Sequence, residues 1–144
     1  MSNKFILLIG VVVALFFVAC SRTNIKTNEK KDITLLGTYW KVLTLYEKKV
    51  DNYNKEAYIK INGDKTINGS LSCNNFFGTV KIEKDNISFE KMGSTRMLCE
   101  NMQIEDNFQK VLNSTKTYKI EKNILSFYDQ NGNKISTFIG VKNK

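Results

Sequence analysis

Short segments of alternating apolar and polar residues, separated by turn residues, run through this chain from Leu35 onward. The alternation has a period of two, which is the spacing of side chains on one face of a β-strand. Ala57, Ile59 and Ile61 show it most clearly, and an Asn-Gly-Asp turn at 62–64 follows them. Because the chain has no proline, its turns must be built from Gly, Asn and Asp. The pattern predicts short antiparallel strands joined by hairpins.

Eight segments are long enough to form strands, and all of them are bounded by turn signals. They cover residues 38–46, 57–61, 66–71, 76–83, 87–92, 117–121, 124–129 and 134–141. One further segment has a helical period, because Ile104, Phe108, Val111 and Leu112 recur at i, i+4, i+7 and i+8. Asn101 is placed to cap the start of this helix. We therefore expect a β-rich α+β fold, in which a small antiparallel sheet forms a partly open barrel and one packed helix covers an open face or edge.

The first 20 residues have the pattern of an export signal. Lys4 supplies the positive charge, residues 5–19 form an apolar stretch, and Cys20 follows directly. A membrane span needs about 20 apolar residues, so this stretch is too short for a comfortable transmembrane helix. It fits the apolar core of a secretory signal that ends in small residues. An uncleaved anchor helix and a plain secretory signal are the alternatives at this point.

The segment Phe17-Val18-Ala19-Cys20 resembles the lipobox of bacterial lipoproteins, although Phe17 stands where Leu, Val or Ile is usual. The resemblance implies that the Cys20 thiol receives a diacylglycerol and that the signal peptide, residues 1–19, is removed. Several acyl chains would then give a stable lipid anchor in the cell envelope. Ser21 follows the cysteine where some sorting systems read Asp as an inner-membrane signal. In a cell with two membranes we therefore expect the outer membrane, with the protein facing the periplasm.

Residues 20–33 are mostly charged or polar, and only Ile25 and Ile33 give them aliphatic side chains. Such a segment cannot bury a core, so we predict a flexible tether here and one folded domain over residues 34–141. From Cys20 onward the chain has 21 basic and 14 acidic residues, and its lysines are scattered through every segment. Nucleic-acid binding would favour a basic stripe, so we expect no nucleic-acid partner. We interpret the excess of lysine as a composition that keeps the surface solvated. The alternative interpretation is weak attraction of the positive charge to anionic lipid head groups.

Two cysteines, Cys73 and Cys99, remain once Cys20 is assigned to lipid. An exported domain with one such pair is expected to oxidise it, which predicts a structural disulfide. A metal site or a reactive thiol is the alternative. Two cysteines in a chain without histidine make a poor zinc ligand set, so we expect no metal.

Three motifs together resemble the META domain, the family of the HslJ heat-shock lipoprotein. The first is Ser-Leu-Ser-Cys-Asn-Asn-Phe-Phe-Gly at 70–78, and the second is Ser-Thr-Arg-Met-Leu-Cys at 94–99, followed by a segment with Gln103 and Glu105. The third is Leu-Leu-Gly-Thr-Tyr-Trp-Lys-Val at 35–42. The resemblance covers about residues 35–141. It implies a compact β-rich fold with one helix, a stress-related role in the envelope, and a comparison with pilot lipoproteins that escort secretins.

Three residues in these motifs are candidates for binding. Arg96 presents a planar fork of donors, which would pair with Glu100 or Glu105 or else bind a carboxylate or phosphate of a partner. Asn74 is expected to support a tight bend, where Asn bonds its own backbone. Phe76 and Phe77 must point to opposite faces of a strand, so Phe77 is a candidate to line a groove.

The sequence predicts a protein that is not an enzyme and uses no cofactor. Without histidine no Ser-His-Asp or Cys-His arrangement is possible, and Gly-rich phosphate loops are absent. We expect a monomeric envelope lipoprotein that works as a binding or accessory module, with an envelope protein as the candidate partner. Two alternatives are a carrier or sensor of a small apolar ligand and an inhibitor of a host enzyme such as lysozyme. The loop at residues 47–56 is the candidate inhibitory segment.

Overall fold

The computed structural model describes residues 33–51 and 55–141. The predicted signal peptide 1–19, the lipidation site Cys20 and the tether up to residue 32 lie outside the described residues, so they stay predictions. Within the described part, no helix is long and apolar enough to cross a membrane.

Nine strands and one helix make up the described part of the chain. The strands are β1 (Tyr39–Leu45), β2 (Lys48–Lys49), β3 (Tyr58–Ile61), β4 (Thr66–Ser70), β5 (Asn75–Glu83), β6 (Asn86–Ser94), β7 (Thr117–Glu121), β8 (Ile124–Tyr128) and β9 (Lys134–Val141), and the helix is α2 (Gln103–Ser114). The eight segments predicted as strands all form strands, and the one helical period forms the helix. The antiparallel, β-rich fold with a single helix is therefore confirmed.

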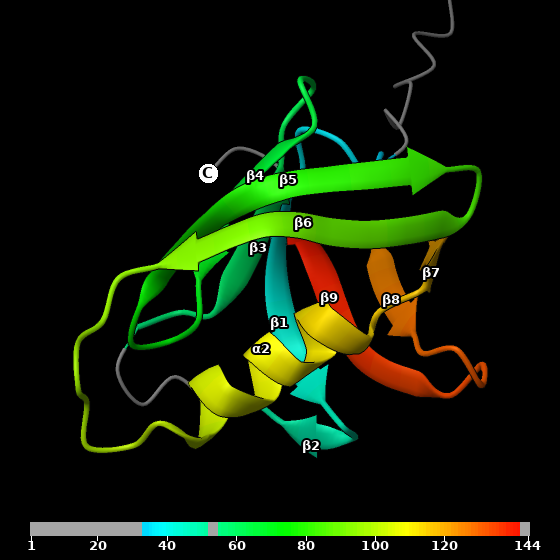
Figure 1. The fold of residues 1–144 in the computed structure, drawn as a ribbon. Coiled ribbons are helices and arrows are strands. Elements are labelled where there is room, and N and C mark those ends of the chain that lie inside the picture. Colours follow the sequence, from blue (N-terminus) through cyan, green and yellow to red (C-terminus); the bar gives the residue numbers. More distant parts are fainter. Residues whose placement is uncertain (1–32, 52–54, 142–144) are drawn as a thin grey trace, which may run out of the picture. The chain divides into compact units, whose positions relative to one another are not determined.

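The sheet has the order β2-β1-β3-β4-β5-β6-β7-β8-β9, and an additional pairing of β1 with β9 returns it on itself (Figure 1). The ring is weakest between β6 and β7, where a single residue pair, Asn86 and Thr117, joins the two strands. Helix α2 connects these same strands, and it packs against β1 and β6. The predicted partly open sheet with a covering helix corresponds to this arrangement.

The core fills the inside of the ring with side chains from alternate strand positions. Trp40 is fully buried, and its indole Nε1 donates a hydrogen bond to the Leu35 carbonyl at 3.0 Å. Phe108 from α2 packs against Phe138, and Phe138 packs against Phe127, with ring centroids 5.8 and 4.9 Å apart. Large aromatic side chains of this kind contribute much of the burial energy of a small domain. The helix therefore completes the core that the sheet begins.

The N-cap of the helix is Met102, which gives no side-chain cap bond, so the cap predicted at Asn101 lies one residue too early. The Asn101 side-chain Oδ1 accepts a hydrogen bond from the backbone N–H of Gln103 at 2.9 Å, which satisfies one of the donors that a helix start leaves unpaired. The face of α2 toward the core holds Phe108, Val111 and Leu112, and it also holds the carboxylate of Glu105. A buried acid on this face was not expected from the apolar period.

The predicted loop at 47–56 is corrected at its start. Lys48 and Lys49 form β2, which pairs with the end of β1 through a tight turn at Tyr46 and Glu47. Both lysines are exposed, so no alternation of apolar residues marks this strand in the sequence. Backbone bonds hold it, including the Val50 N–H to the Leu43 carbonyl at 3.0 Å.

Candidate functional site

A disulfide joins Cys73 to Cys99, with their Cα atoms 6.1 Å apart. Cys73 lies buried in the turn between β4 and β5, and Cys99 lies in the segment between β6 and α2. We name that segment, residues 95–102, the bridge loop. In the chain-entropy model a cross-link across 26 residues stabilises a domain by about 3.5 kcal/mol. The predicted disulfide is present, and it connects the two cysteine motifs.

Asn74 lies next to this disulfide and is 1% exposed. Its Nδ2 donates to the Met97 carbonyl at 2.9 Å and to both carboxylate oxygens of Glu105 at 3.1 Å. Its Oδ1 accepts from the Met97 backbone N–H at 2.7 Å and from the Thr95 hydroxyl at 2.8 Å. One amide therefore connects the β4–β5 turn, the bridge loop and the helix.

Glu105 completes this network from the helix. It is 4% exposed, and its carboxylate accepts hydrogen bonds from the Asn74 backbone N–H at 3.0 Å and from the Gln109 Nε2 at 3.2 Å. A buried carboxyl group is costly unless several donors surround it, and here amide N–H groups of Asn74 and Gln109 donate to it. These hydrogen bonds fix the approach of α2 to the turn.

The structure corrects the local role expected of Asn74. Its side chain bonds residues more than 20 positions away in the sequence, in place of its own turn backbone. The turn is closed instead by the Asn74 carbonyl, which accepts from the Leu71 N–H at 2.7 Å. The amide atoms of Asn74 form hydrogen bonds inside the protein, so they are not open to a ligand. Asn74 instead holds the bridge loop, which carries Arg96, in place.

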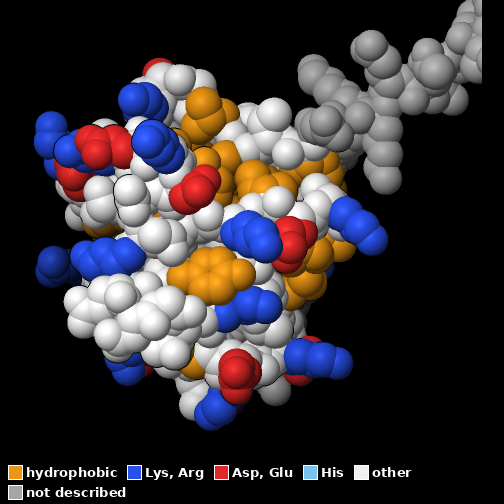
Figure 2. All heavy atoms as spheres, turned by 90° about the vertical axis from the view of Figure 1, so that its right-hand side faces the viewer, with side chains coloured by type: hydrophobic (Ala, Val, Ile, Leu, Met, Phe, Trp, Pro, Cys, Tyr) orange, Lys and Arg blue, Asp and Glu red, His pale blue; other side chains and the backbone are white. Residues whose placement is uncertain are grey.

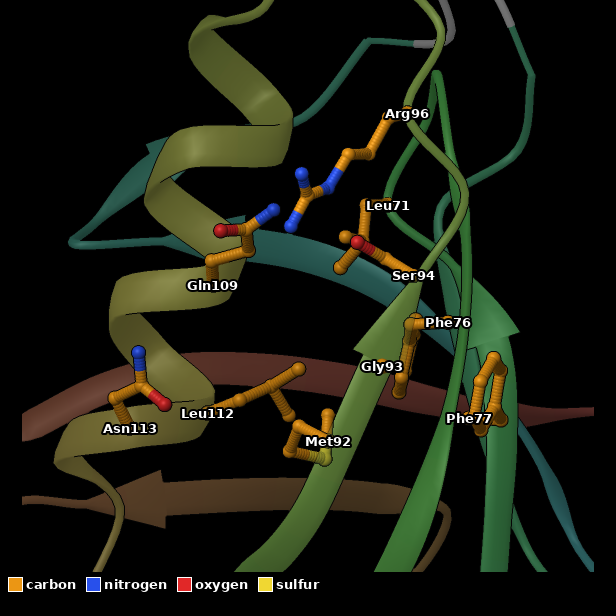
Figure 3. A pocket seen from close by; sticks show the side chains of 10 residues that line it. All are labelled: Leu71, Phe76, Phe77, Met92, Gly93, Ser94, Arg96, Gln109, Leu112 and Asn113. Carbon is orange, nitrogen blue, oxygen red and sulfur yellow. The ribbon is translucent and has the colours of Figure 1, made fainter.

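Arg96 lies on the bridge loop with an exposed side chain. Within the described residues no carboxylate lies within 4 Å of its guanidinium, so the expected pairing with Glu100 or Glu105 is wrong. The physical reason lies in the helix, which turns Glu105 inward to Asn74. The guanidinium instead extends from the loop toward α2, on the side of Gln109 (Figure 3).

A cleft of about 350 Å³ opens between the end of β6 and helix α2, and Arg96 lies at one end of it (Figure 3). We name it the β6–α2 cleft. Its apolar lining comes from Leu71, Phe76, Met92 and Leu112, of which all but Met92 are buried core residues. Its polar lining comes from Ser94, Arg96, Gln109 and Asn113. An apolar floor with a few convergent polar groups is the usual composition of a small-molecule site.

Met92 reaches the cleft because Gly78 leaves room for it. A Cβ built on Gly78 would lie 2.7 Å from the Met92 Sδ and 2.9 Å from the Glu90 carbonyl oxygen. Both contacts are too short for a real side chain, so the close approach of β6 requires glycine at this position. The glycine thereby places a flexible thioether on the wall of the cleft.

Phe77 also borders the cleft, but its side chain leaves β5 on the opposite face from Phe76. Its ring lies over Gly93, where an added Cβ would come within 2.6 Å of the Phe77 Cζ, and the residue is 62% exposed. Both residues line the cleft, Phe76 from the inner face and Phe77 from the outer one, so Phe77 has the groove-lining position considered for it. Phe77 remains an exposed aromatic side chain beside the cleft.

Two more apolar side chains are exposed on the bridge loop. Met97 is 49% exposed and Leu98 is 93% exposed, directly between Arg96 and the disulfide. The disulfide and the Asn74 bonds hold the backbone on both sides of them. We name Arg96, Met97, Leu98 and the adjoining cleft the bridge face.

The face on the other side of the molecule carries charges of both signs. Figure 2 shows basic and acidic side chains interspersed over the side that includes β7 and β8, in place of a stripe of one sign. On β7, Lys119 and Glu121 form an ion pair at 2.9 Å, and this pairing lowers the pKa of the Glu121 carboxyl. Exposed pairs of this kind contribute little to stability.

Sequence reasoning missed several residues of the cleft, namely Met92, Ser94, Gln109 and Asn113. Gln109 follows Glu105 by four positions, so one helical turn places the two side chains together. Met92 depends on the register of β5 and β6, which carries a β-bulge close to Gly78. In the described part of the chain, no group of three or more Cys, Asp or Glu residues could hold a metal ion.

The comparisons with known proteins agree with this architecture. The family model of the META domain matches residues 32–140. A comparison with curated proteins finds no match.

Solved structures show the same fold at low identity. An NMR structure of a protein from Burkholderia xenovorans is 18% identical, with a TM-score of 0.61 over 76% of this chain and 85% of that chain. A crystal structure of a DUF4847 family protein from Bacteroides vulgatus is 17% identical, with a TM-score of 0.55 over 74% of this chain and 94% of that chain. These likenesses concern the fold, whereas the family model matches the sequence across the described domain. The chain belongs to the META domain family.

Proposed function

We propose that this chain is a lipid-anchored, non-enzymatic binding module of the bacterial cell envelope, with a stress-related accessory role and an outer-membrane location facing the periplasm. The lipobox-like segment ending at Cys20 supports the anchor. The chain has no histidine, which supports a role without acid–base or nucleophilic catalysis. The observation that carries the proposal is the bridge face, which a disulfide and a buried hydrogen-bond network hold in place.

The bridge face has the composition of a contact surface. Exposed apolar side chains at Met97 and Leu98 lie beside Arg96, whose guanidinium has no carboxylate partner among the described residues. Arginine and methionine are enriched where proteins bind partners. Holding such a loop rigid before binding reduces the conformational entropy lost on association. The network beneath the loop therefore serves binding as well as stability.

A small-molecule carrier is the second candidate, and the β6–α2 cleft favours it. Inside the ring, Trp40, Phe127 and Phe138 are fully buried core residues, and the rings of Phe127 and Phe138 lie 4.9 Å apart, so side chains fill the space there. A carried molecule would therefore occupy the cleft. For an inhibitor of a host enzyme, the candidate loop at 47–56 begins with β2.

Site-specific photo-cross-linking in living cells tests the binding proposal. A photoreactive residue replaces Leu98 in the full-length protein, and a matched variant carries it at Lys119, which is exposed on β7 at the other end of the molecule. We expect discrete adducts from position 98 and none from position 119. Equal adduct patterns from both positions, or no adduct from position 98, would contradict a role for the bridge face.

A further inference from the structure

The β6–α2 cleft has a single charged residue in its lining, Arg96. The other polar groups there, Ser94, Gln109 and Asn113, are neutral. Glu105, one helical turn before Gln109, does not line the cleft, and its oxygens accept hydrogen bonds from Asn74 and Gln109. The cleft therefore presents one positive charge without a carboxylate partner among the described residues.

One positive charge best complements one negative charge. A guanidinium binds a carboxylate through two parallel N–H···O bonds, which gives both strength and orientation. A phosphate monoester carries up to two charges near neutral pH, and the cleft offers no second cation for it. Charge complementarity thus favours a monoanionic carboxylate at the Arg96 end.

The rest of the cleft fits an aliphatic chain. Its apolar walls are Leu71, close to Arg96, then Phe76, Met92 and Leu112, and Asn113 lies at the end far from Arg96 (Figure 3). A volume of about 350 Å³ holds on the order of ten non-hydrogen atoms, if each takes about 30 Å³. A saturated carboxylate of about eight carbons has this size. Burying its methylene groups against the apolar walls would supply most of the affinity.

We propose that the β6–α2 cleft binds medium-chain aliphatic carboxylates, with the carboxylate on Arg96 and the chain between Met92 and Leu112. This inference rests on the proposed function in one respect, which is that the bridge face is the binding face of the protein. It adds the class of ligand. Gln109 is a positioning residue for the site, because its amide lies beside Arg96 while it bonds Glu105 at 3.2 Å.

Photolabelling of the full-length protein in its own membranes tests this assignment. The probe is an octanoate that carries a diazirine on its chain, and tryptic peptides are mapped by mass spectrometry after irradiation. After reduction of the disulfide we expect label in four peptides, residues 66–81, 92–96, 97–110 and 111–116, because all four contain residues that line the cleft. Excess octanoate should remove the label, whereas 1-octanol and octyl phosphate should need at least ten times the concentration.

Variants of the same protein separate the carboxylate contact from general partitioning. Arg96→Gln should raise the half-competing concentration of octanoate about 10- to 100-fold, which is the worth of a hydrogen-bonded charge. Arg96→Lys keeps the positive charge but lacks the planar fork of donors. Its half-competing concentration of octanoate should therefore lie between that of Arg96→Gln and that of the unchanged protein. Lys119→Gln removes one positive charge from β7, far from the cleft. Its half-competing concentration of octanoate should equal that of the unchanged protein.

Three results would overturn the proposal. They are label outside these four peptides, competition by octanol equal to that by octanoate, and an octanoate half-competing concentration in Arg96→Gln equal to that of the unchanged protein. Stronger competition by octyl phosphate would assign the cleft to a phosphate headgroup and reject the carboxylate. The cross-linking experiment at Leu98 reports on a protein partner and needs no octanoate. Adducts at Leu98 without carboxylate labelling would therefore reject this inference and leave the proposed function standing.

Discussion

Asn74 is the residue on which the bridge face depends most. Its amide is buried and bonds Thr95, Met97 and Glu105, so it satisfies groups on the bridge loop and the helix at once. A buried polar network of this kind stabilises a unique arrangement only while every member is paired. Substitutions here should act on the face as a whole.

Replacing Asn74 by Asp tests this role with a change of almost no volume. Asn74→Asp puts a second carboxylate about 3.1 Å from Glu105 and removes the donor between them. Two buried carboxylates this close repel, so we expect a loss of about 3 kcal/mol or more in unfolding free energy at pH 7. The loss should shrink toward pH 4–5, because a proton shared by the pair restores a donor. Urea unfolding at several pH values measures it, and a loss independent of pH would argue against the Asn74–Glu105 contact.

Tyr39 provides a test at alkaline pH. Its hydroxyl donates to Glu56 Oε1 at 2.8 Å, and Glu56 also pairs with Lys41 at 2.7 Å. Partial burial, and then the hydrogen bond to Glu56, raise the pKa of the Tyr39 hydroxyl well above its ordinary value. The folded-state pKa lies above the unfolded one, so its stabilisation is complete below about pH 10 and is lost as pH rises further.

The Tyr39→Phe variant should therefore differ from the unchanged protein in a pH-dependent way. We expect it to be about 1 kcal/mol less stable at pH 8, because the hydrogen bond is lost. The gap should narrow above pH 10, where the unchanged protein loses the same contribution. Chemical unfolding of both proteins at pH 8 and at higher pH gives the difference directly. A gap that stays constant would show that Tyr39 does not ionise differently in the folded state.

At the scale of elements, the disulfide is what connects the sheet to the bridge loop. It joins the β4–β5 turn to the segment that leads into α2, and the Asn74 bonds run parallel to it. The β6–α2 cleft lies between elements that these contacts hold together. Loss of the disulfide should then loosen the loop and the cleft before it opens the ring.

Single and double cysteine variants measure the contribution of the disulfide. Cys73→Ser and Cys99→Ser should each destabilise the domain by about 2–5 kcal/mol. The double variant should be no worse than either single one, because the same bond is lost in each. A reducing agent should reproduce the loss in the unchanged protein and have no effect on the double variant. Additive losses in the double variant would show that the cysteines act as separate packing residues.

The sequence predicted the elements well because their signals are local. The alternation of Ala57, Ile59 and Ile61, and the helical spacing around Phe108, reflect burial of one face in each element. Strand β2 was missed, since two exposed lysines leave no apolar signal and only backbone bonds define it.

The contacts of the site were harder to predict, because they join residues far apart in the chain. Arg96 was expected to pair with Glu100 or Glu105, or else to bind a carboxylate or phosphate of a partner. The hydrogen bonds from Asn74 hold the Glu105 carboxylate, and Asn74 lies 31 positions from it. Sequence motifs placed Cys73, Asn74, Arg96 and Cys99 in the right region. They could not show which polar groups the fold would satisfy internally and which it would leave open at the cleft.

At the scale of the whole molecule, one ring of strands carries the proposed binding face, on a chain whose leader predicts a lipid anchor. Such an anchor would keep the domain near the membrane. It would thereby raise the effective concentration of the domain toward partners at the membrane surface. The weak β6–β7 pairing leaves α2 to complete the ring on the side of the cleft. Anchor and face are separate features, so they can be tested separately.

The anchor prediction concerns Cys20, which lies outside the described residues. Cys20→Ala removes the only thiol of the lipobox-like segment, so it should abolish acylation and leave an uncut precursor or a released form. Metabolic labelling with a clickable fatty acid, followed by fractionation, measures both effects. The Cys73→Ser variant serves as a control that should keep its label. Label that persists on Cys20→Ala would contradict lipidation at this residue.

The proposed binding face requires the Cys73–Cys99 disulfide to be closed in the protein at its membrane. Differential alkylation measures this directly: full-length protein in isolated membranes is denatured and alkylated with a light reagent, then reduced and alkylated with a heavy one. Mass spectrometry then reports each cysteine separately. We expect Cys73 and Cys99 to carry the heavy label alone. Light label on both would show two free thiols in the envelope, which would contradict a face held by the disulfide.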